Sequence, residues 1–207
     1  MIISHEHRFI FFAVPKTATH SIRAALRPIL SEDDWEQVDL FEKKRLPIAE
    51  LASLEHGHIT AILAKEQLSK TVWEGYYKFA FVRNPFERFV SSCFFIFTGN
   101  KVFDLNPPAF MKLLFKAPSK LSGLHFLPQT EFVCDDRNKI LMNKIGKLES
   151  LENDFTQICH RLELSCSLGE KRNQTMHSHW SDYIDDELRT LIIKIYQPDF
   201  EVLAYTY

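Results

Sequence analysis

The chain of 207 residues lacks any apolar run near the roughly 20 residues that span a bilayer. Its first residues, MIISHEHRFIFFAV, lack the basic start and the small-residue cleavage site of a secretory signal peptide. The 25 Lys and Arg residues do not outnumber the 27 Asp and Glu residues, so no global basic field attracts nucleic acid or anionic lipid. We therefore expect a cytoplasmic protein with no membrane anchor and no nucleic-acid partner.

Cysteine is also sparse. The chain has four, and no two of them have Cys-x-x-Cys spacing. That absence removes the usual sequence signs of a zinc ribbon or a thioredoxin-type motif. Reduced thiols with structural roles are the favoured interpretation. The four residues are Cys93, Cys134, Cys159 and Cys166.

Glycine is missing where a phosphate-binding loop would need it. The stretch FFAVPKTATHSIRAAL, Phe11 to Leu26, reads as a strand, a turn and a helix, yet it contains no glycine. A nucleoside-triphosphate loop has the pattern G-x-x-x-x-G-K-[ST], with glycines before the lysine. No apolar strand ending in Asp is found that could hold a magnesium shell. An anion site that works without a metal fits this turn better than an ATP site.

The residues that are present favour one α/β domain over residues 1–207. Hydrophobic residues make up 45% of the chain, enough for a full core. Apolar, β-favouring runs alternate with segments of helical periodicity, which favours a largely parallel central sheet flanked by helices. The predicted strands are Arg8–Val14, Val38–Phe41, Tyr77–Val82 and Ile145–Leu148. The predicted helices are Thr19–Leu30, Thr60–Leu68, one starting at Pro85, a short piece at Phe110–Phe115, Leu151–Leu162 and Asp185–Tyr196.

Two anion-suited segments follow predicted strands. Pro15–Ser21 runs into a helix N-terminus, where backbone N–H groups and the helix dipole favour an anion, and Lys16 adds positive charge. Arg83 ends a second strand and can bind phosphate in a bidentate manner, with Ser91 two turns into the next helix. The alternatives are a capped helix beside a solvated lysine, and a structural salt bridge at Arg83. In parallel sheets ligands bind at the carboxyl ends of strands, which favours the anion sites.

These segments resemble motifs of the sulfotransferase superfamily, particularly its carbohydrate and uronyl 2-O-sulfotransferase-like bacterial branch. FFAVPKTATHSIRAAL is similar to the 5′-phosphosulfate loop, and FAFVRNPFERFVSS to the 3′-phosphate motif. HFLPQTEFV, IGKLESLENDF and YQPDFEVLAY extend the resemblance over nearly the whole chain. Ala18 and His20 depart from the first motif, where small residues such as Gly or Ser are frequent. The resemblance implies a three-layer, P-loop-like fold.

The resemblance also implies a donor, 3′-phosphoadenosine 5′-phosphosulfate, and no metal. Lys16 would contact the sulfate and the bridging oxygen, and Arg83 and Ser91 would bind the 3′-phosphate. The residues implied for the 5′-phosphate, largely through backbone N–H groups, are Thr17, Ala18, Thr19, His20 and Ser21. The segment EKRNQT resembles a late loop that closes over the nucleotide. Its candidate residues are Lys171, Arg172 and Asn173; an exposed basic turn is the alternative.

A histidine pair is the candidate for proton transfer. EHGHITA places His56 and His58 around Gly57 and resembles the His-Gly-His element of uronyl 2-O-sulfotransferases, where a histidine acts as base. The resemblance assigns His58 as general base and His56 as a supporting or acceptor-binding residue. In HFLPQ, His125 and Gln129 would face the acceptor. The alternatives for the pair are a zinc site, for which no third ligand is suitably spaced, and a helix cap with two solvated histidines.

The leading hypothesis is a sulfotransferase that acts on a hydroxyl acceptor, with carbohydrate expected. Transfer would be in line, with a histidine base and a lysine that stabilises the leaving phosphate. One alternative is a nucleotide-dependent, kinase-like phosphotransferase. The other is a non-catalytic nucleotide-binding module of the same fold. No oligomeric state is assigned.

Overall fold

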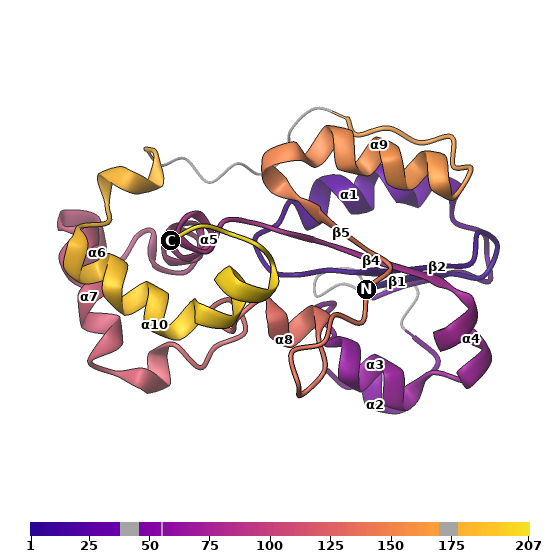
Figure 1. The fold of residues 1–207 in the computed structure, drawn as a ribbon, viewed down its shortest axis with the longest axis horizontal. Helices are drawn as coiled ribbons and strands as arrows, with labels where there is room; N and C mark the ends of the chain where they lie inside the picture. The colour runs from indigo at the N-terminus through magenta and orange to yellow at the C-terminus, as the bar shows by residue number, and fades with distance from the viewer. Residues whose placement is uncertain (38–45, 55, 170–177) are drawn as a thin grey trace. The chain divides into compact units, whose positions relative to one another are not determined.

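A computed structural model describes residues 1–37, 46–54, 56–169 and 178–207. The chain divides into two compact units (Figure 1). The first, which we call the sheet unit, comprises Met1–Val82 and Gln129–Arg172. The second, the helical unit, comprises Arg83–Pro128 and Asn173–Tyr207.

The sheet unit is built on a five-stranded sheet of order β3-β1-β2-β4-β5. The strands are β1 (Ile2–Ser4), β2 (Phe9–Phe12), β3 (Trp35–Glu36), β4 (Tyr77–Val82) and β5 (Lys144–Lys147). The pairs β2–β4 and β4–β5 are parallel, whereas β1 is antiparallel to both β2 and β3. All strands except β1 therefore run in one direction. The predicted α/β class with a largely parallel sheet is confirmed.

Helices cover both faces of this sheet, which completes the three layers (Figure 1). They are α1 (Thr19–Leu26), α2 (Ala49–Ala52), α3 (Ala61–Gln67), α4 (Lys70–Gly75), α8 (Thr130–Val133) and α9 (Leu151–Arg161), with 3₁₀ turns at Arg27–Ile29 and Leu148–Ser150. Helices α1 and α9 lie on one face, and α2, α3 and α4 on the other. Alternate strand residues point to opposite faces. Phe9 and Phe11 accordingly join the core with Ile22 of α1 and Phe155 of α9, while Phe12 meets Trp73 of α4.

The helical unit contains α5 (Pro85–Phe97), α6 (Lys101–Leu105), α7 (Pro107–Phe115) and α10 (Asp186–Val202), with 3₁₀ turns at Pro118–Lys120 and Trp180–Asp182. Helix α5 begins at Pro85 because the Asn84 side chain accepts the N–H groups of Phe86 and Glu87. The apolar stripe of α5 packs against that of α10. Helix α10 kinks at Tyr196, two residues before Pro198, whose ring disfavours helical backbone before it.

Some predicted elements differ from those observed. The helix predicted over Thr19–Leu30 ends at Leu26 and continues as a 3₁₀ turn, since Pro28 has no N–H for an α-helical bond. The segment from residue 98 to 128, predicted as mostly irregular, holds α6 and an α7 that starts earlier, at Pro107. The strand predicted at Val38–Phe41 lies outside the described residues.

Candidate functional site

The turn between β2 and α1 has an unusual backbone for a segment without glycine. Lys16 has φ of 67° and Ala18 has φ of 59°, both in the left-handed region. Residues other than glycine rarely adopt this region, and each instance costs about 1–2 kcal/mol. Such strain collects at functional sites, and left-handed residues in a turn form concave nests of N–H groups that bind anions. The turn thus has the form of an anion loop despite its sequence.

The start of α1 supports the same interpretation. Ala18 occupies the N-cap position, and no side chain caps the helix. The N–H groups of the first turn are therefore presented to solvent or to a ligand. The Thr17 hydroxyl donates to the Val14 carbonyl oxygen at 3.0 Å and is fully buried. The Thr17 hydroxyl thus stabilises the turn itself.

Positive charge acts on the partly covered side chain of His20 on the first turn of α1. Burial lowers the pKa of His20, and the nearby charges of Arg23, Lys16 and Arg27 lower it further. The neutral imidazole of His20 is therefore favoured when no anion is bound. An anion bound among these groups would offset the repulsion.

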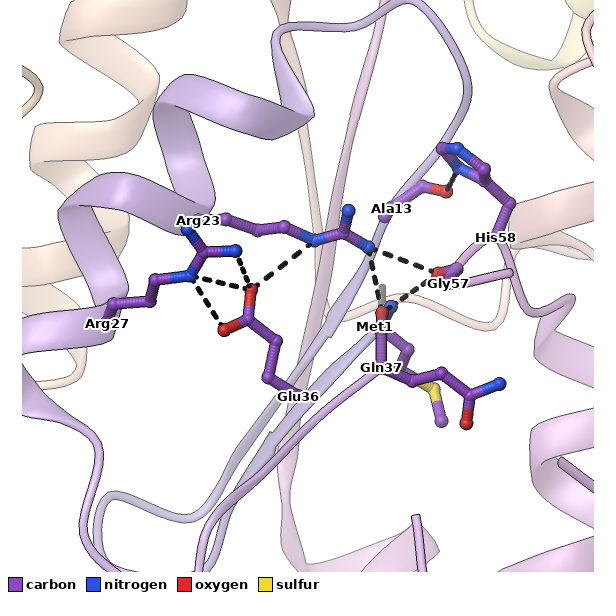
Figure 2. Close-up of polar contacts among 8 residues, drawn as sticks. All are labelled: Met1, Ala13, Arg23, Arg27, Glu36, Gln37, Gly57 and His58. Atoms are coloured by element: carbon purple, nitrogen blue, oxygen red, sulfur yellow. Dashed lines mark hydrogen bonds and ion pairs between the residues drawn. The ribbon is translucent and has the colours of Figure 1, made fainter. Parts of the chain in front are cut away.

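His58 is oriented toward the strand that leads into this turn. Its Nδ1 lies 2.7 Å from the carbonyl oxygen of Ala13, the residue after β2 (Figure 2). A carbonyl oxygen only accepts, so Nδ1 must carry the proton in this contact. In the neutral ring the lone pair is then on Nε2, the tautomer that a general base needs.

His56 has the opposite tautomer. Its Nδ1 accepts the backbone N–H of His58 at 3.3 Å, so the neutral ring carries its proton on Nε2. The two rings lie 6.3 Å apart between centroids. His58 is thus suited to take a proton, and His56 to donate a hydrogen bond. These tautomers could not be predicted from the sequence.

The loop that carries both histidines is held by a buried polar cluster (Figure 2). The Arg23 guanidinium donates to the carbonyl oxygens of Gln37 at 3.2 Å and Gly57 at 3.4 Å, and the Met1 amino group donates to the same two oxygens. A β-carbon at Gly57 would overlap the Gln37 oxygen and the Arg23 guanidinium, so only glycine fits there. Burial lowers the pKa of Arg23 to about 10, with Glu36 acting in the opposite direction.

The second motif lies in the helical unit from Arg83 onward. Arg83 forms an ion pair with Glu87 at 3.1 Å, and Ser91 of α5 is buried. Arg88, also in α5, is fully buried. Burial lowers the pKa of Arg88, while Tyr196 and Asp199 of α10 raise it. The Arg88 side chain thus belongs to the packing between α5 and α10.

The predicted acceptor residues fall in different units. His125, in the helical unit, packs its ring 4.9 Å from that of Phe95, and its carbonyl oxygen accepts the Ser92 hydroxyl at 2.9 Å. Gln129, in the sheet unit, is fully buried at the start of α8. Their contact with an acceptor stays a prediction. Lys171, Arg172 and Asn173 lie outside the described residues.

Sequence reasoning missed Arg23 and Gln37. Both are distant in sequence from the histidines that they support, and a lone Arg on a helix gives no signal of burial. Among the described residues, no group of three or more His, Cys, Asp or Glu side chains is placed to hold a metal ion. Within the same residues, no helix combines the length and apolar character of a membrane span.

Comparison with known families identifies the chain. The model of the sulfotransferase family matches residues 1–206. The chain belongs to the sulfotransferase family. This sulfotransferase is thus a transferase of sulfuryl groups, and its family implies an acceptor that bears a hydroxyl. No match is found among curated proteins or among solved structures.

Proposed function

We propose that this sulfotransferase transfers the sulfuryl group of 3′-phosphoadenosine 5′-phosphosulfate to a carbohydrate hydroxyl. The observation that carries the proposal is the 2.7 Å contact between His58 Nδ1 and the Ala13 oxygen. It ties a base of the required tautomer to Ala13, on the segment that enters the turn before α1. Family membership and the nest-like turn support the same assignment.

The turn fits the 5′ end of this donor. Backbone N–H groups from Thr17 to Ser21 and the dipole of α1 would hold the 5′-phosphate, with Ala18 and His20 contributing through the backbone. Lys16, beside them, would stabilise charge on the oxygen that bridges phosphorus and sulfur. When bound, the donor supplies the sulfuryl group and leaves as adenosine 3′,5′-bisphosphate. The metal-independent character expected from the sequence is part of this proposal.

The remaining donor contacts come from other segments. We assign the 3′-phosphate to Arg83 and Ser91, with the Glu87 carboxylate as the present partner of the guanidinium. Lys171, Arg172 and Asn173 are proposed to close over the nucleotide. These assignments treat residues 1–207 as one sulfotransferase domain made of two units.

His58 would remove the proton of the attacking hydroxyl through Nε2. The Ala13 carbonyl stabilises the imidazolium that results, since its oxygen faces the Nδ1 proton. His56, with its proton on Nε2, would donate a hydrogen bond to the acceptor, and His125 and Gln129 are proposed as further acceptor contacts. The two histidines thus have different roles, which makes them a matched pair for experiment.

Substitution of each histidine by glutamine tests this division. His58→Gln should lower kcat about 10²- to 10⁴-fold near neutral pH, since glutamine cannot take the proton. His56→Gln should raise the KM of the acceptor with a smaller effect on kcat. The measurement is transfer of labelled sulfuryl group to desulfated uronic-acid polysaccharides over a range of pH. If His58→Gln keeps the wild-type kcat, the base lies elsewhere.

A further inference from the structure

Two of the four cysteines meet at the end of α9. The Sγ atoms of Cys159 and Cys166 lie 3.1 Å apart, in direct contact. Cys159 is buried in the core under α9, whereas Cys166 is partly exposed. Neither residue belongs to the turn between β2 and α1 or to the loop that carries His56 and His58. The sequence suggested only separate structural thiols.

The end of α9 fixes this meeting. The Leu164 N–H donates to the Cys159 carbonyl at 2.9 Å and the Glu163 N–H to that of His160 at 3.3 Å, the two bonds of a Schellman motif. Glu163 has φ of 54°, the left-handed conformation that this motif requires. Leu164 is buried and joins the core beside Cys159. The chain is thus reversed by a defined turn, and Cys166 returns to Cys159 without rearrangement.

Cys166 is accessible from a hollow beside α1. The hollow has a volume of about 310 Å³ and is lined by Ser21, Ala25 and Pro28 as well as Ser165 and Cys166. Its mixture of small polar and apolar side chains admits a small neutral oxidant such as hydrogen peroxide. The buried partner, Cys159, needs no access of its own, because it reacts only with Cys166.

The two thiols are not equivalent. A hydrogen bond from Cys159 lowers the pKa of Cys166, while that bond and burial raise the pKa of Cys159. Cys166 is therefore the first of the two to lose its proton, and Cys159 stays a thiol. A thiolate is the form that reacts with peroxide, and an adjacent thiol resolves the product.

We propose that Cys159 and Cys166 are a peroxide-reactive pair that closes to a disulfide. The Cys166 thiolate attacks one peroxide oxygen and breaks the O–O bond, which gives a sulfenic acid and hydroxide. The Cys159 sulfur then attacks the Cys166 sulfur, forms the S–S bond and loses its proton, and the sulfenic oxygen leaves as water. Overall, two thiols and one hydrogen peroxide give one disulfide and two waters. The proposal is independent of the sulfuryl-transfer assignment.

Mass spectrometry of the full chain tests this pair. The reduced protein is treated with one equivalent of hydrogen peroxide, free thiols are alkylated in denaturant, and the peptides are mapped. Before alkylation, the intact chain should be roughly 2 Da lighter than the reduced chain, because two thiol hydrogens are lost. After alkylation and digestion, Cys159 and Cys166 should be recovered in one cross-linked peptide. The Cys134→Ala variant is the control. Cys134 is a buried free cysteine outside the pair, so the variant should form the same cross-link.

A second variant separates the two steps. In Cys159→Ser the resolving thiol is absent, so the sulfenic acid of Cys166 should persist and be trapped by dimedone, whereas wild type should give little adduct. Separate alkylation of Cys159 and Cys166 after peroxide would overturn the proposal. Cross-links that involve Cys93 or Cys134 in place of this pair, or dimedone labelling absent from Cys159→Ser, would overturn it as well.

Discussion

At the scale of single residues, the turn between β2 and α1 obtains its shape at a cost in stability. Lys16 and Ala18 are held with positive φ, where glycine would avoid the clash between β-carbon and backbone. A lysine at this position places its charge on the turn itself, which glycine could not do. The missing glycines therefore do not argue against an anion loop. At Lys16 the left-handed backbone comes with a charged side chain, whereas Ala18 has the same backbone without a charge.

His20 gives a pH-dependent test at the same scale. Burial first, and then Arg23, Lys16 and Arg27, hold its pKa below the ordinary value. A bound anion opposes these charges, so adenosine 3′,5′-bisphosphate should raise the pKa of His20. Because binding then takes up a proton, affinity should increase as the pH falls through the pKa of the complex and level off below the pKa of the free protein. The ring-proton shifts of His20, followed by NMR against pH with and without the ligand, measure this directly.

The His20→Gln variant provides the control for that titration. It identifies the resonance of His20 and should reduce the pH dependence of affinity in the same range. A pKa of His20 that does not change when the ligand binds would place the anion elsewhere.

At the scale of elements, the histidine loop depends on one glycine. A β-carbon at Gly57 meets the Gln37 backbone and the Arg23 guanidinium, so Gly57→Ala must displace the buried cluster. We expect the free energy of unfolding to fall by about 1–3 kcal/mol, the usual cost of overpacking. Thermal or chemical unfolding of purified protein measures the difference.

Gly123→Ala is the matched variant for this prediction. No atom lies within 4 Å of a β-carbon placed there, so its effect should stay within about 0.5 kcal/mol. Equal stability of the two variants would contradict the proposed constraint at Gly57.

The elements that were predicted correctly have a signal within their own stretch of sequence. β4 matches its predicted range because its apolar run is unbroken, and α5 starts at Pro85 because Asn84 caps it. β1 was missed, since three residues followed by a turn carry too little pattern and gain their stability by pairing with β2 and β3. The tautomers of His56 and His58 were also beyond prediction. The His58 tautomer depends on the Ala13 carbonyl, 45 residues away in the sequence. The His56 tautomer depends on the backbone N–H of His58.

At the scale of the whole molecule, the family match covers residues 1–206, and the motifs that led to it lie in both units. The turn between β2 and α1 and the histidine pair belong to the sheet unit, while Arg83 and Ser91 belong to the helical unit. The sequence was sufficient for the family because its motifs are linear. The supporting cluster of Arg23, Gln37 and Gly57 was not predicted, since it is assembled from distant segments.

The central claim is that the chain uses 3′-phosphoadenosine 5′-phosphosulfate, and calorimetric titration with adenosine 3′,5′-bisphosphate tests it most directly. We predict binding without added metal and in preference to ATP. Arg83→Ala should weaken it roughly 10- to 100-fold through loss of charge-assisted hydrogen bonds, whereas Arg137→Ala, at an exposed site, should not. Absence of binding, a preference for ATP with magnesium, or unchanged affinity in Arg83→Ala would contradict the account.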